Sequence, residues 1–109
     1  MKLIGLKFLP KYCTIEFPDA IRIRPTVAYT LDVMNTSLDI MYSIEAPNVN
    51  IFILSPHSTH LTTGTEGRFA KYITFQKMDQ GVKQNFNLVL TVKLGSADEK
   101  TVRLPIIYK

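Results

Sequence analysis

Hydrophobic and polar residues alternate most clearly between Gln84 and Tyr108. Every second residue from Phe86 to Leu94 is apolar, and a second alternation covers Val102 to Tyr108. A period of two predicts a strand with one buried face and one exposed face. Turn-forming residues at 95–99 separate the two runs, so we expect an antiparallel hairpin. Because an isolated hairpin is marginally stable in water, this hairpin must lie in a larger sheet that a second layer covers.

The rest of the chain contains further short runs with the same period, separated by proline, glycine and other turn formers. The strands predicted in this way are 2–9, 12–17, 21–24, 26–34, 39–45, 49–54 and 69–76, with a short strand around His60. Residues 35–37 are expected to form a polar turn. The nearly continuous apolar run at 49–54 predicts a central strand, or a strand whose outer face binds a partner. Dense prolines before residue 26 instead predict edge or bridging segments.

Helical periodicity is weak throughout the chain, so we expect little helix. Short strands with regularly spaced turns are typical of an all-β fold, an antiparallel β-sandwich of about seven to nine strands. A length of 109 residues suits one hydrophobic core. The prediction is therefore a single β-sandwich domain, 1–109.

Composition and charge narrow the function classes. The chain is 46% hydrophobic and 20% charged, and no stretch approaches a membrane span, so we expect a folded, soluble protein. The 13 Lys and Arg residues are dispersed, which favours a solvated surface over a nucleic-acid site. A single cysteine, Cys13, excludes an internal disulfide and favours a reducing, cytoplasmic compartment. The glycosylation triplet that begins at Asn35 is interpreted as a turn.

Residues with metal or nucleophile chemistry do not form a recognisable motif. His57 and His60 could share one metal, but no third ligand accompanies them closely, so no metal is expected. Cys13, Ser55 and Ser58 are possible nucleophiles only by residue type, because nothing resembles a nucleophile elbow.

Carboxylates and glycines give no stronger signal. Asp98 and Glu99 are expected in the hairpin loop, where adjacent acids usually serve solubility. Residues 64–67 are too short and too acidic to cradle a phosphate, and no helix signal follows them. We therefore expect neither catalysis nor a cofactor, and binding through a sheet face, an edge or loops.

A family resemblance extends this interpretation. The segments Asn35-Thr36-Ser37-Leu38-Asp39-Ile40, Ala46-Pro47 and Ile51-Phe52-Ile53-Leu54-Ser55-Pro56 resemble the ear (appendage) domains of clathrin adaptors, most closely the gamma-adaptin ear. The final stretch, with Val102-Arg103-Leu104-Pro105-Ile106, is similar to the last strands of the alpha-adaptin ear and of arrestin-like domains. The resemblance implies an immunoglobulin-like β-sandwich that recruits accessory proteins. Members of the family capture short peptides that carry phenylalanine or tryptophan among acidic residues.

The resemblance also implies a peptide-binding groove at defined positions. Ala46 and Pro47 would frame the groove, Ile53 would form an apolar wall, Pro56 would close one end, and Lys93 would supply a basic rim. Burial of a phenylalanine would contribute about 2 kcal/mol. A cation at the rim would select acidic neighbours in the ligand.

Departures from the family pattern leave alternatives open. Asn48 stands where the gamma ear has a basic residue, and Val89 and Thr91 stand where it has two arginines. The part of the site that reads acidic residues is therefore largely missing, so either the ligand differs or the domain is a scaffold. For Ile53 and Leu54, core packing is at least as strong an interpretation as a pocket.

Three functions follow from these observations. The first is a non-enzymatic interaction module of a trafficking or coat-type complex, peripheral to membranes through its partners. It would bind short peptide motifs or neighbouring subunits, without nucleic acid and without membrane insertion. The second is a purely structural immunoglobulin-like or arrestin-like domain in a larger assembly. The third is an extracellular adhesion domain, for which the Asn35 triplet would be glycosylated. A segment of a longer chain would explain why strand pattern follows Met1 almost directly.

Overall fold

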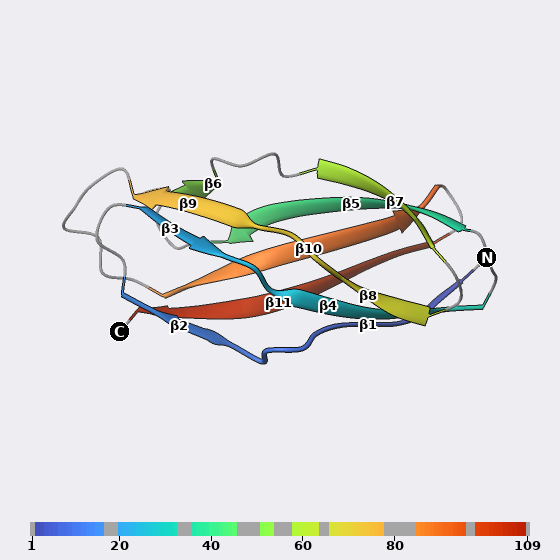
Figure 1. The fold of residues 1–109 in the computed structure, drawn as a ribbon, viewed down its shortest axis with the longest axis horizontal. Helices are drawn as coiled ribbons and strands as arrows, with labels where there is room; N and C mark the ends of the chain where they lie inside the picture. Colours follow the sequence, from blue (N-terminus) through green and yellow to red (C-terminus); the bar gives the residue numbers. More distant parts are fainter. Residues whose placement is uncertain are drawn as a thin grey trace.

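The structure is a computed structural model that describes residues 2–16, 20–32, 36–45, 51–53, 58–63, 66–77, 85–95 and 98–108. The molecule is elongated, with extents of 47 × 22 × 20 Å, and its strands form two layers (Figure 1). The described residues form strands and their connections, and no helix. The all-β prediction is confirmed.

The hairpin that the sequence predicts lies in the five-stranded layer. Strands β10 (Phe86–Leu94) and β11 (Asp98–Tyr108) pair antiparallel along their length, and Gly95, with a φ of +57°, begins the turn. Strand β5 (Thr36–Glu45) pairs with the other side of β10, and β7 (Ser58–Thr63) pairs with β5. Strand β2 (Cys13–Ile15) runs parallel to β11 and completes the order β2-β11-β10-β5-β7. The predicted hairpin is thus the centre of this layer.

The second layer consists of two three-stranded sheets placed end to end. Strand β4 (Thr26–Leu31) lies between β1 (Leu3–Phe8) and β8 (Glu66–Ala70), and β9 (Ile73–Lys77) lies between β3 (Ala20–Ile23) and β6 (Ile51–Ile53).

The two sheets are joined by one long antiparallel pair of arms, residues 20–31 (β3 and β4) and residues 66–77 (β8 and β9). Ile23 pairs with Ile73 and Thr26 pairs with Ala70, so the register is the same before and after the interruption. Pro25, which has no N–H to donate, lies in this interruption. The eleven strand segments that the structure describes therefore form nine strands, because β3 continues into β4 and β8 into β9, and nine lies within the predicted range of seven to nine.

The proline-rich first part of the chain lies at sheet edges, as predicted. Among the described strands, β1 pairs only with β4 in the second layer, whereas β2 pairs only with β11 in the five-stranded layer. Pro10 lies in the bend between them, so the chain changes layers there. Strand β1 also lies beside β11, which closes this side of the sandwich (Figure 1).

Three local predictions were wrong. Thr36 and Ser37 begin the ten-residue strand β5 instead of forming a turn, because the alternation of β5 extends through them and they pair with β7. Of the apolar run at 49–54 the structure describes Ile51–Ile53 as β6, which among the described strands pairs with β9 at a sheet edge, so the central-strand alternative was wrong; a binding role for the outer face stays a prediction. Asp98 and Glu99 belong to β11 and not to the hairpin loop.

The core fills the space between the layers. The rings of Phe75 on β9 and Phe86 on β10 meet edge to face, with centroids 5.3 Å apart, and so join the two layers. Tyr42 is fully buried on β5, and its hydroxyl has no hydrogen-bond partner among the described residues. Burial raises the pKa of Tyr42 to about 12.

Two aspartates hold the first strand in place. Asp98 accepts hydrogen bonds from the backbone N–H of Leu3, at 2.8 Å, and of Glu99, at 2.9 Å. Asp32 accepts a hydrogen bond from the backbone N–H of Lys2 at 2.6 Å. The bonds from Leu3 and Glu99 favour the ionised carboxylate and lower the pKa of Asp98. Asp98 therefore has a structural role, and its interpretation as a solubility feature was wrong.

This arrangement predicts a pH-dependent contribution of Asp98 to stability. Because its folded-state pKa is depressed, the contribution is present above the unfolded-state pKa and is lost as pH falls through the folded-state pKa. Asp98→Asn should lower the urea midpoint at neutral pH, and the difference from wild type should shrink in acid. Glu99→Gln is the matched control, and an identical pH dependence of the two variants would contradict the role of Asp98.

Candidate functional site

The outward side of β5, β10 and β11 is the most continuous described surface of the five-stranded layer. Alternation directs Ile40, Tyr42, Leu88 and Leu90 into the core, so the intervening residues point outward. We call this surface the five-stranded face; its members are Asp39, Met41, Ser43, Glu45, Asn87, Val89, Thr91, Lys93, Glu99, Thr101, Arg103 and Pro105.

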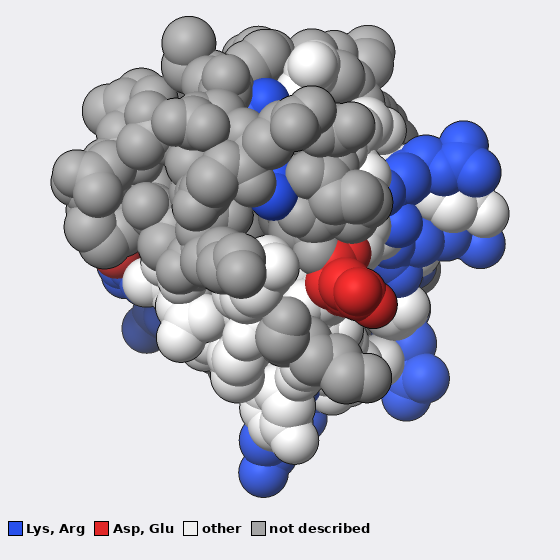
Figure 2. Space-filling view, turned by 90° about the vertical axis from the view of Figure 1, so that its left-hand side faces the viewer, with Lys and Arg blue, Asp and Glu red and all other residues white. Residues whose placement is uncertain are grey.

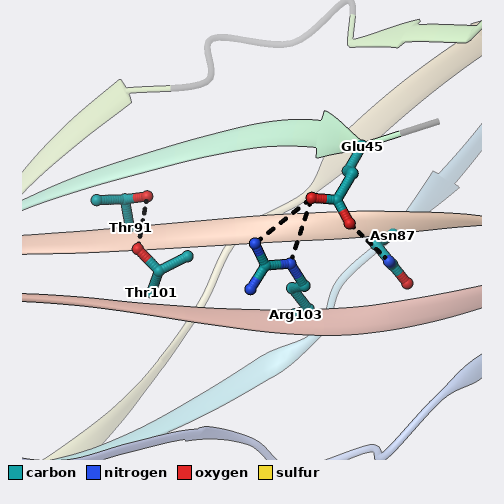
Figure 3. Close-up of polar contacts among 5 residues, drawn as sticks. All are labelled: Glu45, Asn87, Thr91, Thr101 and Arg103. Atoms are coloured by element: carbon teal, nitrogen blue, oxygen red, sulfur yellow. Dashed lines mark hydrogen bonds and ion pairs between the residues drawn. The ribbon is translucent and has the colours of Figure 1, made fainter. Parts of the chain in front are cut away.

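A polar network crosses the five-stranded face (Figure 3). Asn87 donates from Nδ2 to Glu45 Oε1 at 3.1 Å, and Arg103 donates from Nε and Nη2 to Glu45 Oε2, each at 3.4 Å. The network thus links β10, β5 and β11. The Arg103 and Glu45 side chains are 52% and 55% exposed, so their ion pair contributes little to stability. Its structural effect is to orient both charged groups on the surface.

A pocket of about 450 Å³ lies beside this network. Its lining consists of Glu45, Asn85, Phe86, Asn87, Pro105, Ile106 and Ile107. Asn85 accepts a hydrogen bond from the backbone N–H of Tyr108 at 2.8 Å, which fixes the start of β10 against the end of β11. The pocket therefore combines an apolar surface from Pro105 and Ile107 with polar groups that strands hold in place. Its volume is in the range of sites that bind small ligands or single side chains.

The structure describes only two of the five residues assigned to a peptide groove. Ala46, Pro47 and Pro56 lie outside the described residues. Ile53 is partly buried in β6 and packs against the core, as the core-packing alternative expects. Lys93 is exposed on β10, in register with Asp39 and Glu99 on the adjacent strands. Ile53 and Lys93 belong to different layers, so they do not share a surface, and the groove stays a prediction.

The network and pocket residues were not found by sequence reasoning. The alternation in 86–108 does place Asn87 and Arg103 on the outward face. Glu45, however, belongs to another strand, and only the pairing of Asn87 with Glu45 across β10 and β5 brings it next to them. The alternation of polar residues within each strand therefore identifies which side chains lie on the five-stranded face. It does not identify which of them contact one another across strands.

Reactive side chains do not gather into a site in the described part of the chain. Cys13 is a half-buried thiol, and burial raises its pKa, which disfavours the nucleophilic thiolate. His57 lies outside the described residues, and of His60 only the backbone, in β7, is described. Among the described residues, no three His, Cys, Asp or Glu side chains lie close enough to hold a metal ion. The described residues also contain no helix with the length and apolar character of a membrane span.

Comparisons with known proteins show the fold. No family model matches the chain, and no curated protein matches it. A mutant of Salmonella alpha-2-macroglobulin superposes with a TM-score of 0.65 at 14% identity, over 95% of this chain. The chain spans 6% of that protein's length. A conjugative transposon lipoprotein from Bacteroides eggerthii superposes with a TM-score of 0.51 at 11% identity, over 93% of each chain.

The class of the domain follows from the strand order together with these structures. The chain folds as an immunoglobulin-like β-sandwich, and its described strand pairs are antiparallel except that of β2 with β11, which is parallel and departs from the all-antiparallel prediction. The two superpositions support this broad class and give no particular support to the ear domain of a clathrin adaptor. At identities this low they show the fold alone, so function has to be inferred from the surfaces of this chain.

Proposed function

We propose that this sandwich is a non-enzymatic protein-interaction module that binds a partner protein through the five-stranded face. The observation that carries the proposal is the Arg103–Glu45–Asn87 network beside the pocket at Pro105 and Ile107. Protein interfaces gain most of their affinity from an apolar or aromatic anchor in a pocket, while polar groups at the rim exclude water and set orientation. The five-stranded face provides both elements side by side.

Preorganisation supports this proposal. The three polar side chains of the network come from three paired strands, and their mutual contacts reduce the entropy that a partner would lose in ordering them. A guanidinium carries five N–H donors, so Arg103 can contact Glu45 and still donate to a partner's carbonyl or carboxylate oxygen. The pocket then receives one apolar side chain of the partner.

The narrower proposal, a trafficking adaptor in the cytoplasm, is supported only by the resemblance of residues 35–58 to adaptor ears. Its ligand would be a phenylalanine peptide with acidic neighbours, and its contact surface would be residues 46–56. The cytoplasmic location in this proposal agrees with the free Cys13, because the cytoplasm keeps thiols reduced. Titration with such a peptide should shift the amide signals of 46–56, and an absence of shifts there would remove the adaptor proposal.

The test of the sheet-face proposal uses a neutral peptide, a phenylalanine flanked by serines, added to the ¹⁵N-labelled chain. We expect chemical-shift changes to concentrate at Glu45, Asn87 and Ile107. Ile107→Ser should weaken binding about fivefold, because it removes apolar surface from the pocket. Tyr12→Ser is the matched control, since Tyr12 is 59% exposed and lies outside the pocket lining. Shifts that avoid the pocket up to the solubility limit of the peptide would refute the proposal.

A further inference from the structure

The outer side of the second layer concentrates basic side chains that are dispersed in the sequence. The constant register of the two arms, 20–31 and 66–77, directs their described even-numbered side chains outward, because the odd-numbered Val27, Ile73 and Phe75 are buried. We call the resulting surface the arginine face; its members are Lys7, Arg22, Arg24, Arg68 and Tyr72, all exposed. Figure 2 shows a group of lysine and arginine side chains projecting at its right-hand side, next to an acidic side chain, with further basic side chains at the bottom and left.

An arginine pair is held in a defined orientation on this face. The guanidinium carbon of Arg22 lies 4.5 Å from the centroid of the Tyr72 ring, and that of Arg24 lies 5.2 Å from it. Both distances are within the range of cation–π attraction. A guanidinium stacked on an aromatic ring keeps its in-plane N–H donors available at its edges. Tyr72 thus orders two arginine forks without consuming the donors that would recognise an anion.

Among the side chains that the structure describes, the arginine face carries positive charge with no acidic side chain in its own strands; Glu66 of β8 lies outside that described set. On the five-stranded face the opposite holds, because Arg103 contacts Glu45 and Lys93 lies in register between two acids. Interfaces match potential of one sign with the other, so the arginine face is complementary to an acidic partner.

The shape of this face fits an extended ligand. Small residues separate the basic side chains along the strands. Lys7 and Arg68 are both in register with Ala28, one on each neighbouring strand, and these three residues line a hollow of about 390 Å³. Arg22 and Arg24 are two residues apart on one arm, which places their Cα atoms about 7 Å apart. Alternate side chains of an extended peptide project on one side with the same spacing of about 7 Å.

We propose that the arginine face binds an extended acidic segment of a partner protein, with carboxylates at alternate positions that pair with Arg22 and Arg24. Bidentate pairing of guanidinium with carboxylate supplies the specificity. Single-stranded nucleic acid is disfavoured, because such sites stack bases on several aromatic rings. Tyr72, between β8 and β9, is the one aromatic residue among the members of the arginine face, and its ring already contacts two guanidiniums. The inference rests on the proposed function only in taking a protein as the partner.

The test measures binding of two fluorescent peptides of equal composition, one with alternating glutamate and serine and one with its glutamates in a single block. We expect the alternating peptide to bind more tightly. Arg22→Ala with Arg24→Ala should weaken its binding about twenty-fivefold, about fivefold for each exposed ion pair. Arg22→Lys with Arg24→Lys should give an intermediate affinity, because lysine keeps the charge but loses the planar fork. Affinity should fall with added salt.

The matched control is Lys11→Ala with Lys100→Ala, which removes the same charge from exposed positions outside the arginine face. Equal losses in the two double-alanine variants would show a response to net charge alone and would overturn the proposal. Failure of the alternating peptide to bind, or tighter binding of a single-stranded oligonucleotide, would also overturn it. The neutral peptide and Ile107→Ser test the pocket separately, so either proposal can fail without the other.

Discussion

Replacing Phe75 with alanine is expected to lower the free energy of unfolding by about 3–5 kcal/mol. Phe75 is fully buried, and its ring meets that of Phe86 at an interplanar angle of 75°. Because the two rings belong to different layers, truncation leaves a cavity at the contact between the layers. A domain of this size is typically stable by about 5–15 kcal/mol, so the variant should be close to the limit of folding.

Urea denaturation followed by circular dichroism measures this loss, and Tyr72→Ala is the control. Tyr72 lies three residues before Phe75 on the same arm but is 52% exposed, so its truncation removes its contacts with Arg22 and Arg24 without opening a cavity and should cost about 1 kcal/mol or less. Phe75→Leu and Phe86→Leu, measured singly and combined, form a double-mutant cycle with smaller losses of stability. The coupling energy between the two rings should be about 0.5–1.5 kcal/mol. Equal stability of the two alanine variants would contradict this placement of Phe75.

The local pattern of the sequence determines strands better than it determines their neighbours. The alternation in 86–108 was enough to place both strands of the hairpin and their buried sides. The alternation could not show that β5 pairs with β10, or that β2 runs parallel to β11. Any strand with one apolar face could form hydrogen bonds with the free edge of β10 or of β11. The continuity of register past Pro25 is likewise a property of two arms that are far apart in the sequence.

The same limit applies to the candidate sites. The net charge and the dispersed basic residues predicted only a solvated surface. Arg22 and Arg68 come to lie on the same face only because the two arms pair, and the sequence pattern does not show that pairing. The predicted peptide groove combined residues near one turn with Lys93. In the structure, Lys93 is in register with two acidic residues on the adjacent strands. Positions of like parity within a strand could be predicted. Contacts between strands could not, because they depend on pairing between segments that the local pattern leaves undetermined.

Gly67→Ala should lower stability by about 1–3 kcal/mol through overpacking. A Cβ at this position would lie 2.6 Å from Oη of Tyr29, closer than these atoms can approach, and 3.0 Å from its Cζ, a tight contact. Tyr29 has little room to move, because it is 6% exposed and its ring packs against Phe69 with centroids 5.9 Å apart. The substitution must therefore displace the ring or the backbone of β8.

Two further variants separate this steric cause from a general cost of losing glycine. Tyr29→Phe removes Oη, the atom nearest to the added methyl group, so the double variant should recover about 1 kcal/mol relative to additivity. Gly5→Ala is the matched control in β1, where the Cβ would meet Thr30 at an ordinary 3.7 Å, and it should change stability by about 0.5 kcal/mol or less. Urea midpoints of the wild type and of the four variants, the double variant included, decide the question. If Gly5→Ala and Gly67→Ala lose the same stability, the tyrosine ring does not cover Gly67, and the pairing of β4 with β8 that places it there would be wrong.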